Sequence, residues 1–272
     1  MDPFQGRVVA ITGAASGIGR ALALEMARRG AHLALCDLDQ AGLDETVRQI
    51  ASHHVSAARV DVADRPAVEA WAQQTLAHHG RVDAIVNNAG VTVQQTLAEL
   101  SYEDLEWIVG VNFWGVVHGT QAFLPHLLGR GAGWVVNVSS VFGLLAFPGQ
   151  GSYNATKFAV RGLTEALRWE LEGTGVAVCS VHPGLVRTNI VRNGRLYRDA
   201  MGRVAPSEMA ARFEQLARTS PSRAAKTIAD GMARREPRIL VGTDARLLDA
   251  LQRLAPRRYG AILRRLVELI DR

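Results

Sequence analysis

Short apolar runs alternate along the chain with longer segments whose apolar residues recur at helical spacing. The runs are apolar at nearly every position, which is typical of strands buried on both faces of a parallel sheet. They predict strands at residues 7–12, 32–37, 55–61, 82–87, 134–139 and 176–182. The segments between them predict helices at about residues 17–29, 39–52, 64–79, 101–129 and 152–172.

This strict alternation predicts an α/β fold: a single Rossmann-like, doubly wound parallel sheet flanked by helices, with right-handed crossovers. A further strand is expected at residues 238–241, after a helix that begins near Pro221. No internal repeat, low-complexity segment or flexible linker divides the chain. We therefore expect residues 1–272 to form a single domain.

The segment at residues 189–220 interrupts the alternation of strands and helices. It is rich in Arg, Gly, Met and Ala, and it follows the carboxyl end of a predicted strand. Ligands of open α/β sheets bind at such strand ends. The segment is interpreted either as a pair of surface helices or as a small lid over a substrate.

Residues 244–272 predict a helical C-terminal extension of two short helices divided by Pro256. One stripe of the second helix is apolar, and it consists of Ile262, Leu266, Leu269 and Ile270. The stripe favours packing on the domain or on a second subunit. Contact of the neighbouring arginines with an anionic membrane surface is the less favoured alternative.

Composition excludes several classes of protein. The 272 residues are 48% hydrophobic and 21% charged, which is ordinary for a globular chain. The net charge of +5 resides in residues 234–272, which hold ten arginines and five acidic residues, so no nucleic-acid partner is expected. Cys36 and Cys179 lie in apolar runs, as expected of buried thiols in a reducing compartment. With no apolar stretch of 18 residues and no leader pattern, we expect a soluble, cytoplasmic protein.

A glycine-rich loop follows the first predicted strand and opens the first predicted helix. Within it, Gly13 allows a tight turn, Gly17 lets the backbone approach a pyrophosphate, and Gly19 lets the helix pack on the strand. Ser16 and Ile18 complete the loop. The N–H groups of the helix N-terminus then favour bound phosphates. The pattern predicts a dinucleotide site.

Asp37 ends the second predicted strand, 18 residues after Gly19. A carboxylate there accepts hydrogen bonds from ribose hydroxyls and repels a 2′-phosphate, which favours NAD over NADP. A helix-capping role for Asp37 is the alternative, and Arg20 is the nearby cation that would weaken the preference. Asp61 and Val62, at the end of the third predicted strand, are candidates to hold the adenine.

Tyr153 and Lys157 are four residues apart, so they share one face of a helix. A tyrosine near its ordinary pKa of about 10 is a weak base at neutral pH. A neighbouring ammonium, together with the positive ring of an oxidised nicotinamide, would lower the pKa of Tyr153 toward neutrality. Lys157 is notable because Lys226 is the other lysine among 31 basic residues.

With these motifs in order, the chain resembles the short-chain dehydrogenase/reductase family, in the branch of roughly 250-residue members. The resemblance covers residues 7 to about 190. Its motifs are the glycine-rich loop, Asn88-Ala89-Gly90 after the fourth strand, Asn112, Ser140, Tyr153 with Lys157, and Pro183-Gly184 with Thr188.

The resemblance implies a role for each of these residues. Tyr153 would be the general acid/base, Lys157 would lower its pKa and bind the nicotinamide ribose, and Ser140 would hydrogen-bond the substrate oxygen. Asn112 would hold a water molecule that links Lys157 to solvent. The implied cofactor contacts are Gly13, Ser16, Gly17, Ile18, Gly19, Asp37, Asp61, Val62, Asn88, Ala89, Gly90, Tyr153, Lys157, Pro183, Gly184 and Thr188. No metal is implied, and a homodimer or homotetramer is expected.

The apolar segment 141–150 links Ser140 to the helix that carries Tyr153, which favours a hydrophobic secondary alcohol or ketone as substrate. The leading hypothesis is therefore NAD-dependent oxidoreduction of such a substrate. An NADP-dependent carbonyl reductase is the first alternative. A non-catalytic protein that senses the cofactor is the second, although such a protein has no need of a proton-transfer set.

Overall fold

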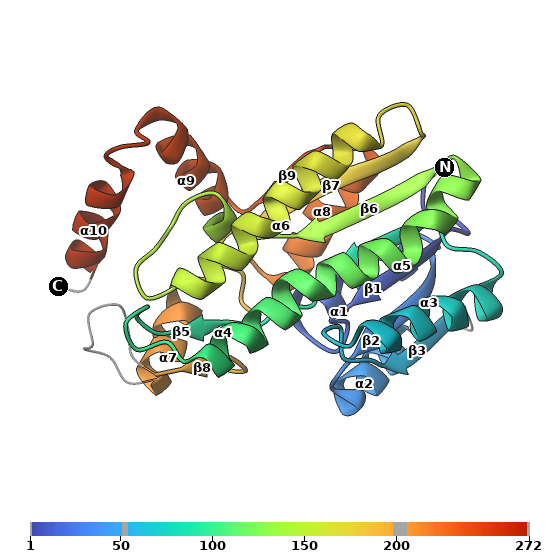
Figure 1. The fold of residues 1–272 in the computed structure, drawn as a ribbon, viewed down its shortest axis with the longest axis horizontal. Coiled ribbons are helices and arrows are strands. Elements are labelled where there is room, and N and C mark those ends of the chain that lie inside the picture. The colour runs from blue at the N-terminus through green and yellow to red at the C-terminus, as the bar shows by residue number, and fades with distance from the viewer. Residues whose placement is uncertain (1, 51–53, 198–205, 271–272) are drawn as a thin grey trace.

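A seven-stranded parallel sheet forms the centre of the computed structural model, which describes residues 2–50, 54–197 and 206–270 (Figure 1). The strand order is β3-β2-β1-β4-β6-β7-β9. Their bounds are β1 Val8–Thr12, β2 His32–Asp37, β3 Val55–Arg59, β4 Ala84–Asn87, β6 Gly133–Val138, β7 Val176–Pro183 and β9 Arg238–Val241. The doubly wound parallel sheet predicted from the apolar runs is confirmed.

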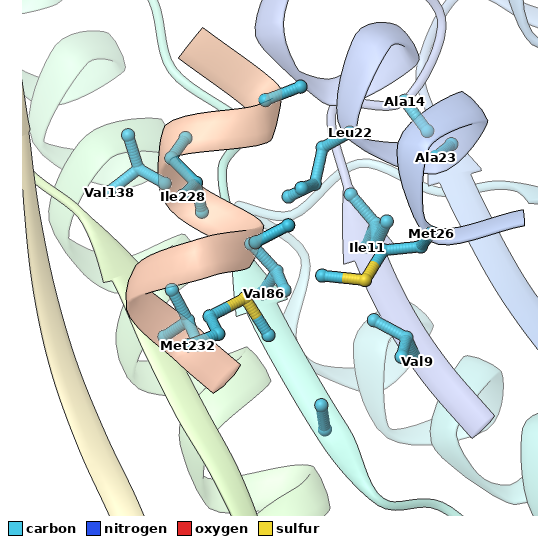
Figure 2. Close-up of a cluster of buried hydrophobic side chains, with 14 of the residues drawn as sticks. Val9, Ile11, Ala14, Leu22, Ala23, Met26, Val86, Val138, Ile228 and Met232 are labelled. Carbon is cyan, nitrogen blue, oxygen red and sulfur yellow. The ribbon is translucent and has the colours of Figure 1, made fainter. Parts of the chain in front are cut away.

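Helices cover both faces of this sheet. They are α1 Gly17–Arg28, α2 Gln40–Ile50, α3 Arg65–His79, α4 Tyr102–Val109, α5 Gly115–Arg130, α6 Gly151–Glu170 and α8 Pro221–Ala233. Because successive strand residues point to opposite faces, Val9 and Ile11 pack against α1 and α8, whereas Ala10 packs on the side of α3 and α5. Figure 2 shows the first of these clusters, where Met26 of α1 and Met232 of α8 lie over Val86 of β4.

One strand departs from the expected burial. The apolar run at residues 55–61 predicts a strand buried on both faces, but β3 ends at Arg59 and its side chains are half-buried or exposed. The prediction is wrong here because β3 is an edge strand, paired only with β2 in the sheet. Ser56 and Arg59 are tolerated on it for this reason.

The segments outside the alternation lie at the carboxyl ends of the strands. Part of residues 189–220 forms β8 (Arg195–Leu196), which pairs with β5 (Val93–Gln94), and α7 (Pro206–Leu216); residues 198–205 lie outside the described residues. The C-terminal extension forms α9 (Thr243–Leu254) and α10 (Tyr259–Ile270), divided near Pro256 as predicted. Ile262 of the apolar stripe is 37% exposed, and the side chains of Leu266, Leu269 and Ile270 lie outside the described residues. No helix in the described parts of the chain is both long and apolar enough to cross a membrane.

Candidate active site

The glycine-rich loop folds tightly against the loop that follows β4. Gly13 and Gly17 have φ angles of +68° and +56°, which a side chain disfavours. A Cβ on Gly13 would lie 2.7 Å from the Cα of Ala89, and one on Gly19 would collide with the carbonyl oxygen of Gly13. Ser16 makes no side-chain capping hydrogen bond to α1. The first-turn N–H groups are thus left for an anion, as a bound pyrophosphate requires.

Asp37 fixes this loop and lies beside it. One carboxylate oxygen accepts a hydrogen bond of 2.8 Å from the backbone N–H of Ala15, and the other accepts one of 3.0 Å from Asp39. Because a carboxylate oxygen has two acceptor positions, Asp37 retains capacity for the hydroxyls of a ribose. The structure thus places Asp37 beside the glycine-rich loop and gives it a part in shaping that loop.

Two arginines lie near Asp37 and bear on the choice of cofactor. The guanidinium of Arg20 is hydrogen-bonded to the backbone oxygens of Ala15 and Gly42 and to Thr46, so it is committed to the protein. Arg59, which is not among the residues predicted for the site, is exposed and donates a hydrogen bond of 3.1 Å to the carbonyl of Leu38. What could have pointed to Arg59 is its position at the end of β3, where it pairs in register with Asp37 of β2.

The loops after β4 and β7 meet the glycine-rich loop. The amide of Asn88 donates hydrogen bonds of 2.9 and 3.1 Å to the carbonyls of Thr12 and Gly13. A Cβ on Gly17 would lie 3.2 Å from the methyl group of Thr188, so that side chain packs over the loop. Residues predicted from three separate strand ends are therefore brought together.

Asp244, at the start of α9, holds the loop after β7 in place. Its carboxylate accepts a hydrogen bond of 2.6 Å from the backbone N–H of Leu185 and lies against Gly184, where a Cβ would collide with it. Asp244 is not among the residues predicted for the site. Its signal was its position just after the last strand, beside the strand that ends in Pro183 and Gly184.

Tyr153 and Lys157 lie one turn apart on α6, and both are buried. The ammonium of Lys157 donates a hydrogen bond of 3.0 Å to the carbonyl of Val138 and lies 5.6 Å from the centroid of the Tyr153 ring. No acidic side chain among the described residues pairs with it. The arrangement places an unpaired cation next to the phenol.

The protonation of this pair differs from the simple expectation. Burial raises the pKa of Tyr153 to about 12, and a hydrogen bond with Ser140 opposes that rise. Burial also lowers the pKa of Lys157 to about 8. Burial of the phenol thus outweighs the hydrogen bond with Ser140, and in the protein alone the pKa of Tyr153 lies above its ordinary value. The positive charge of an oxidised nicotinamide would favour the phenolate.

Ser139 and Ser140 have different surroundings. The hydroxyl of Ser139 donates a hydrogen bond of 2.8 Å to the carbonyl of Lys157, so it is bound to the backbone of α6. The hydroxyl of Ser140 faces Tyr153 and accepts from the backbone N–H of Phe142 at 3.1 Å. Its carbonyl contacts Nδ1 of the fully buried His182, at 3.1 Å. The geometry favours Ser140 as the serine that contacts a substrate.

Asn112 lies in a π-helical turn, η1 (Gly110–Trp114), between α4 and α5. Its side chain accepts from the N–H of Val91 at 2.8 Å and donates to the carbonyl of Val91 at 2.9 Å. It also donates to the hydroxyl of Thr156 at 3.2 Å. Single π-turns within α-helices occur frequently at functional sites. Here the turn ties the loop after β4 to the helix that carries Tyr153.

A cleft of about 1610 Å³ joins these parts. The predicted residues that line it are Gly13, Ser16, Gly17, Ile18, Asp37, Asp61, Val62, Asn88, Ala89, Gly90, Ser140, Tyr153, Lys157, Pro183, Gly184 and Thr188. Gly19 and Asn112 are predicted site residues that do not line it. The glycine cradle, the uncapped helix and the carboxylate at the end of β2 fit a dinucleotide. No group of three or more His, Cys, Asp or Glu side chains in the described ranges is arranged to hold a metal ion.

A dinucleotide cradle on a doubly wound sheet, continuous with a buried tyrosine–lysine pair, defines an oxidoreductase that uses a nicotinamide cofactor. Residues 7–198 match the model of the short chain dehydrogenase family, and the chain belongs to this family.

Individual relatives support this assignment. The putative oxidoreductase SadH of Mycobacterium tuberculosis is 46% identical over 97% of this chain and 96% of its own length. The meso-2,3-butanediol dehydrogenase of Serratia marcescens is 38% identical over 76% of this chain and 86% of its own length. Among solved structures, a short chain dehydrogenase/reductase from Burkholderia phymatum in complex with NAD is 34% identical, with a TM-score of 0.86 over 93% of this chain and 95% of that one.

Proposed function

We propose that this protein transfers a hydride between NAD(H) and a hydrophobic secondary alcohol or ketone, with Tyr153 as the general acid/base. The observation that carries the proposal is the meeting of Tyr153, Ser140 and Lys157 in a single cleft with the glycine-rich loop. We further propose that residues 1–272 act as a single oxidoreductase domain.

Each residue of the site has a chemical task in this proposal. When bound, the nicotinamide supplies a hydride acceptor or donor and, when oxidised, a positive charge. Ser140 orients the substrate oxygen, and the phenol oxygen of Tyr153 takes the alcohol proton during oxidation or returns it during reduction. Lys157 holds its ammonium beside the phenol and favours the phenolate. Asn112 keeps the loop after β4 against α6, and we propose that it also orders a proton-relay water.

The preference for NAD rests on Asp37 and on the commitment of Arg20 to backbone oxygens. The exposed guanidinium of Arg59 supports the alternative, use of NADP. Changing Asp37 to Ala together with Leu38→Arg should remove the repulsion of a 2′-phosphate and add a cation. We expect the ratio of kcat/KM for NAD over NADP to fall at least tenfold. An unchanged ratio would contradict this placement of the ribose.

The reaction is tested by following absorbance of the reduced nicotinamide with a panel of apolar secondary alcohols and ketones. We expect turnover in the wild type and a loss of at least a hundredfold in Tyr153→Phe, since general acid–base catalysis contributes about 10²–10⁴. Calorimetry of NAD binding is the control, because the phenylalanine variant should still bind the cofactor. Best turnover on charged or sugar-like alcohols without an apolar body would overturn the substrate class.

A homodimer or homotetramer remains a prediction. Trp114 on η1 and Phe158 on α6 are 49% and 40% exposed, which makes them candidates for subunit contact. Sedimentation equilibrium of the wild type tests the prediction, and a monomer at micromolar concentration would contradict it.

A further inference from the structure

The far wall of the cleft is built by helices that come late in the chain. Apolar side chains from α7, α9 and α10 line it, namely Phe213, Leu216, Leu248 and Leu263. The helix α10 is fastened to the active-site loop, because the backbone N–H of Ala146 donates a hydrogen bond of 3.3 Å to the hydroxyl of Tyr259. The first turns of α10 are therefore part of the site.

The charged residues along the cleft are sharply divided. Among the described lining residues, the acidic ones are Asp37, Asp39 and Asp61, which lie at or just after the ends of β2 and β3. The basic ones are Lys157, next to Tyr153, and Arg264, on α10. In Figure 1, α10 and β2 lie at opposite ends of the molecule, so Arg264 belongs to the substrate end.

Arg264 is exposed and has no ion-pair or hydrogen-bond partner among the described side chains. Arg195, near the same cleft, contrasts with it: its guanidinium pairs with Asp104 at 2.7 Å and stacks 4.2 Å from the ring of Trp107. Arg257 and Arg258, which directly precede Tyr259, are also exposed and unpaired within the described parts of the chain. At the mouth of an apolar cleft, Arg264 thus presents a guanidinium that no described side chain pairs with, close in sequence to two further arginines, which suits a carboxylate or phosphate.

We propose that the substrate is amphiphilic: an apolar body fills the cleft, and an anionic group at its end pairs with Arg264. The part of this inference that places the reacting carbon at Tyr153 rests on the proposed function. The anion site itself stands on the position of Arg264 and on the apolar wall around it. A carboxylate and a phosphate can each pair with the guanidinium of Arg264, and the experiment below distinguishes the two groups.

Kinetics with matched substrates tests the proposal in the holoenzyme. The substrates are medium- and long-chain hydroxy acids with a secondary alcohol near the end of the chain, together with their methyl esters. We expect wild-type kcat/KM to favour the acid by about tenfold, and Arg264→Gln to remove that preference without changing the rate on the ester. Arg265→Gln is the matched control, because Arg265 is exposed on the same helix and does not line the cleft.

Calorimetry with dodecanoate, dodecyl phosphate and 2-dodecanol separates the anion site from catalysis. We expect either anion to bind Arg264→Gln about tenfold more weakly than the wild type and to bind Arg265→Gln unchanged, which supports the anion site. That support holds even if no alcohol is oxidised. The lack of oxidation would overturn the proposed function but not the anion site. Tighter binding of the phosphate than of the carboxylate assigns the anionic group to a phosphate, and the reverse assigns it to a carboxylate. Equal losses of anion affinity in Arg264→Gln and Arg265→Gln would overturn the anion site. So would oxidation of the acid and its methyl ester by the wild type at equal rates.

Discussion

Replacing Lys157 with Met should make the cofactor-free protein more stable while it removes activity. Lys157 is 3% exposed, and burial lowers the pKa of its ammonium from 10.5 to about 8. Because the folded-state pKa lies below that of the unfolded chain, the unfolded state binds more protons between about pH 8 and pH 10.5. The cost of burying the ammonium is thus fully present below pH 8, and it corresponds to about 3 kcal/mol.

The methionine variant has no buried ammonium and so lacks this cost. It also lacks the hydrogen bond to the carbonyl of Val138, which stabilises the wild type by about 1 kcal/mol. We expect Lys157→Met to be about 2 kcal/mol more stable at pH 7. At pH 10 the cost of burial falls to about 1 kcal/mol, so the two proteins should be nearly equal in stability. Urea unfolding at the two pH values measures both differences.

Lys226→Met is the matched control, because Lys226 is exposed on α8 and the chain has no third lysine. Its effect on the free energy of unfolding should stay within about 0.5 kcal/mol at either pH. The reasoning fails if Lys157→Met is less stable than the wild type at pH 7. It also fails if the gain in unfolding free energy does not shrink as the pH rises. Either result would mean that burial of the ammonium does not carry the expected cost.

Two further predictions concern groups around the site. Burial lowers the pKa of His182 to about 4, so the folded protein holds it neutral and stability falls as the pH drops from 6.5 toward 4. Between pH 7 and pH 5, wild-type unfolding free energy should fall by about 2 kcal/mol more than that of His182→Gln; equal acid sensitivity in urea titrations would refute the assignment. Gly19→Ala drives a Cβ into the carbonyl oxygen of Gly13 and should cost about 1–3 kcal/mol and abolish NAD binding in calorimetry. Gly162→Ala, on open helix surface, should instead stabilise by up to about 1 kcal/mol, and a harmless Gly19→Ala would contradict the close packing of the loop.

The alternation of strands and helices along the chain and the carboxyl-end motifs could be predicted because they depend on local pattern. An apolar run followed by Gly13 or Asp37 marks a strand end, and parallel strands bring all such ends to one edge of the sheet. The proximity of Tyr153 and Lys157 could be predicted equally well, since helical spacing alone places them on one face.

What could not be predicted depends on tertiary context. The exposure of β3 follows from its edge position, and sequence gives no sign of which strand lies outermost. Arg59 and Asp244 act through neighbours that are distant in the chain, as does the hydroxyl of Tyr259 on the loop at Ala146. The pKa of Tyr153 depends on how completely it is buried, which no spacing of residues reveals.

The cleft draws its two halves from different parts of the gene product. The match to the family ends at residue 198, and the glycine-rich loop, Tyr153 and Lys157 all lie before that point, whereas the far wall comes from α7, α9 and α10. Side chains on that wall can therefore be exchanged without replacing Tyr153 or Lys157, provided that Asp244, which holds the loop after β7, is kept. For enzyme engineers, substitution of the lining residues of these helices is a more direct route to new substrate scope than exchange of the whole C-terminal portion, because α8 and β9 from the same portion belong to the core and the sheet.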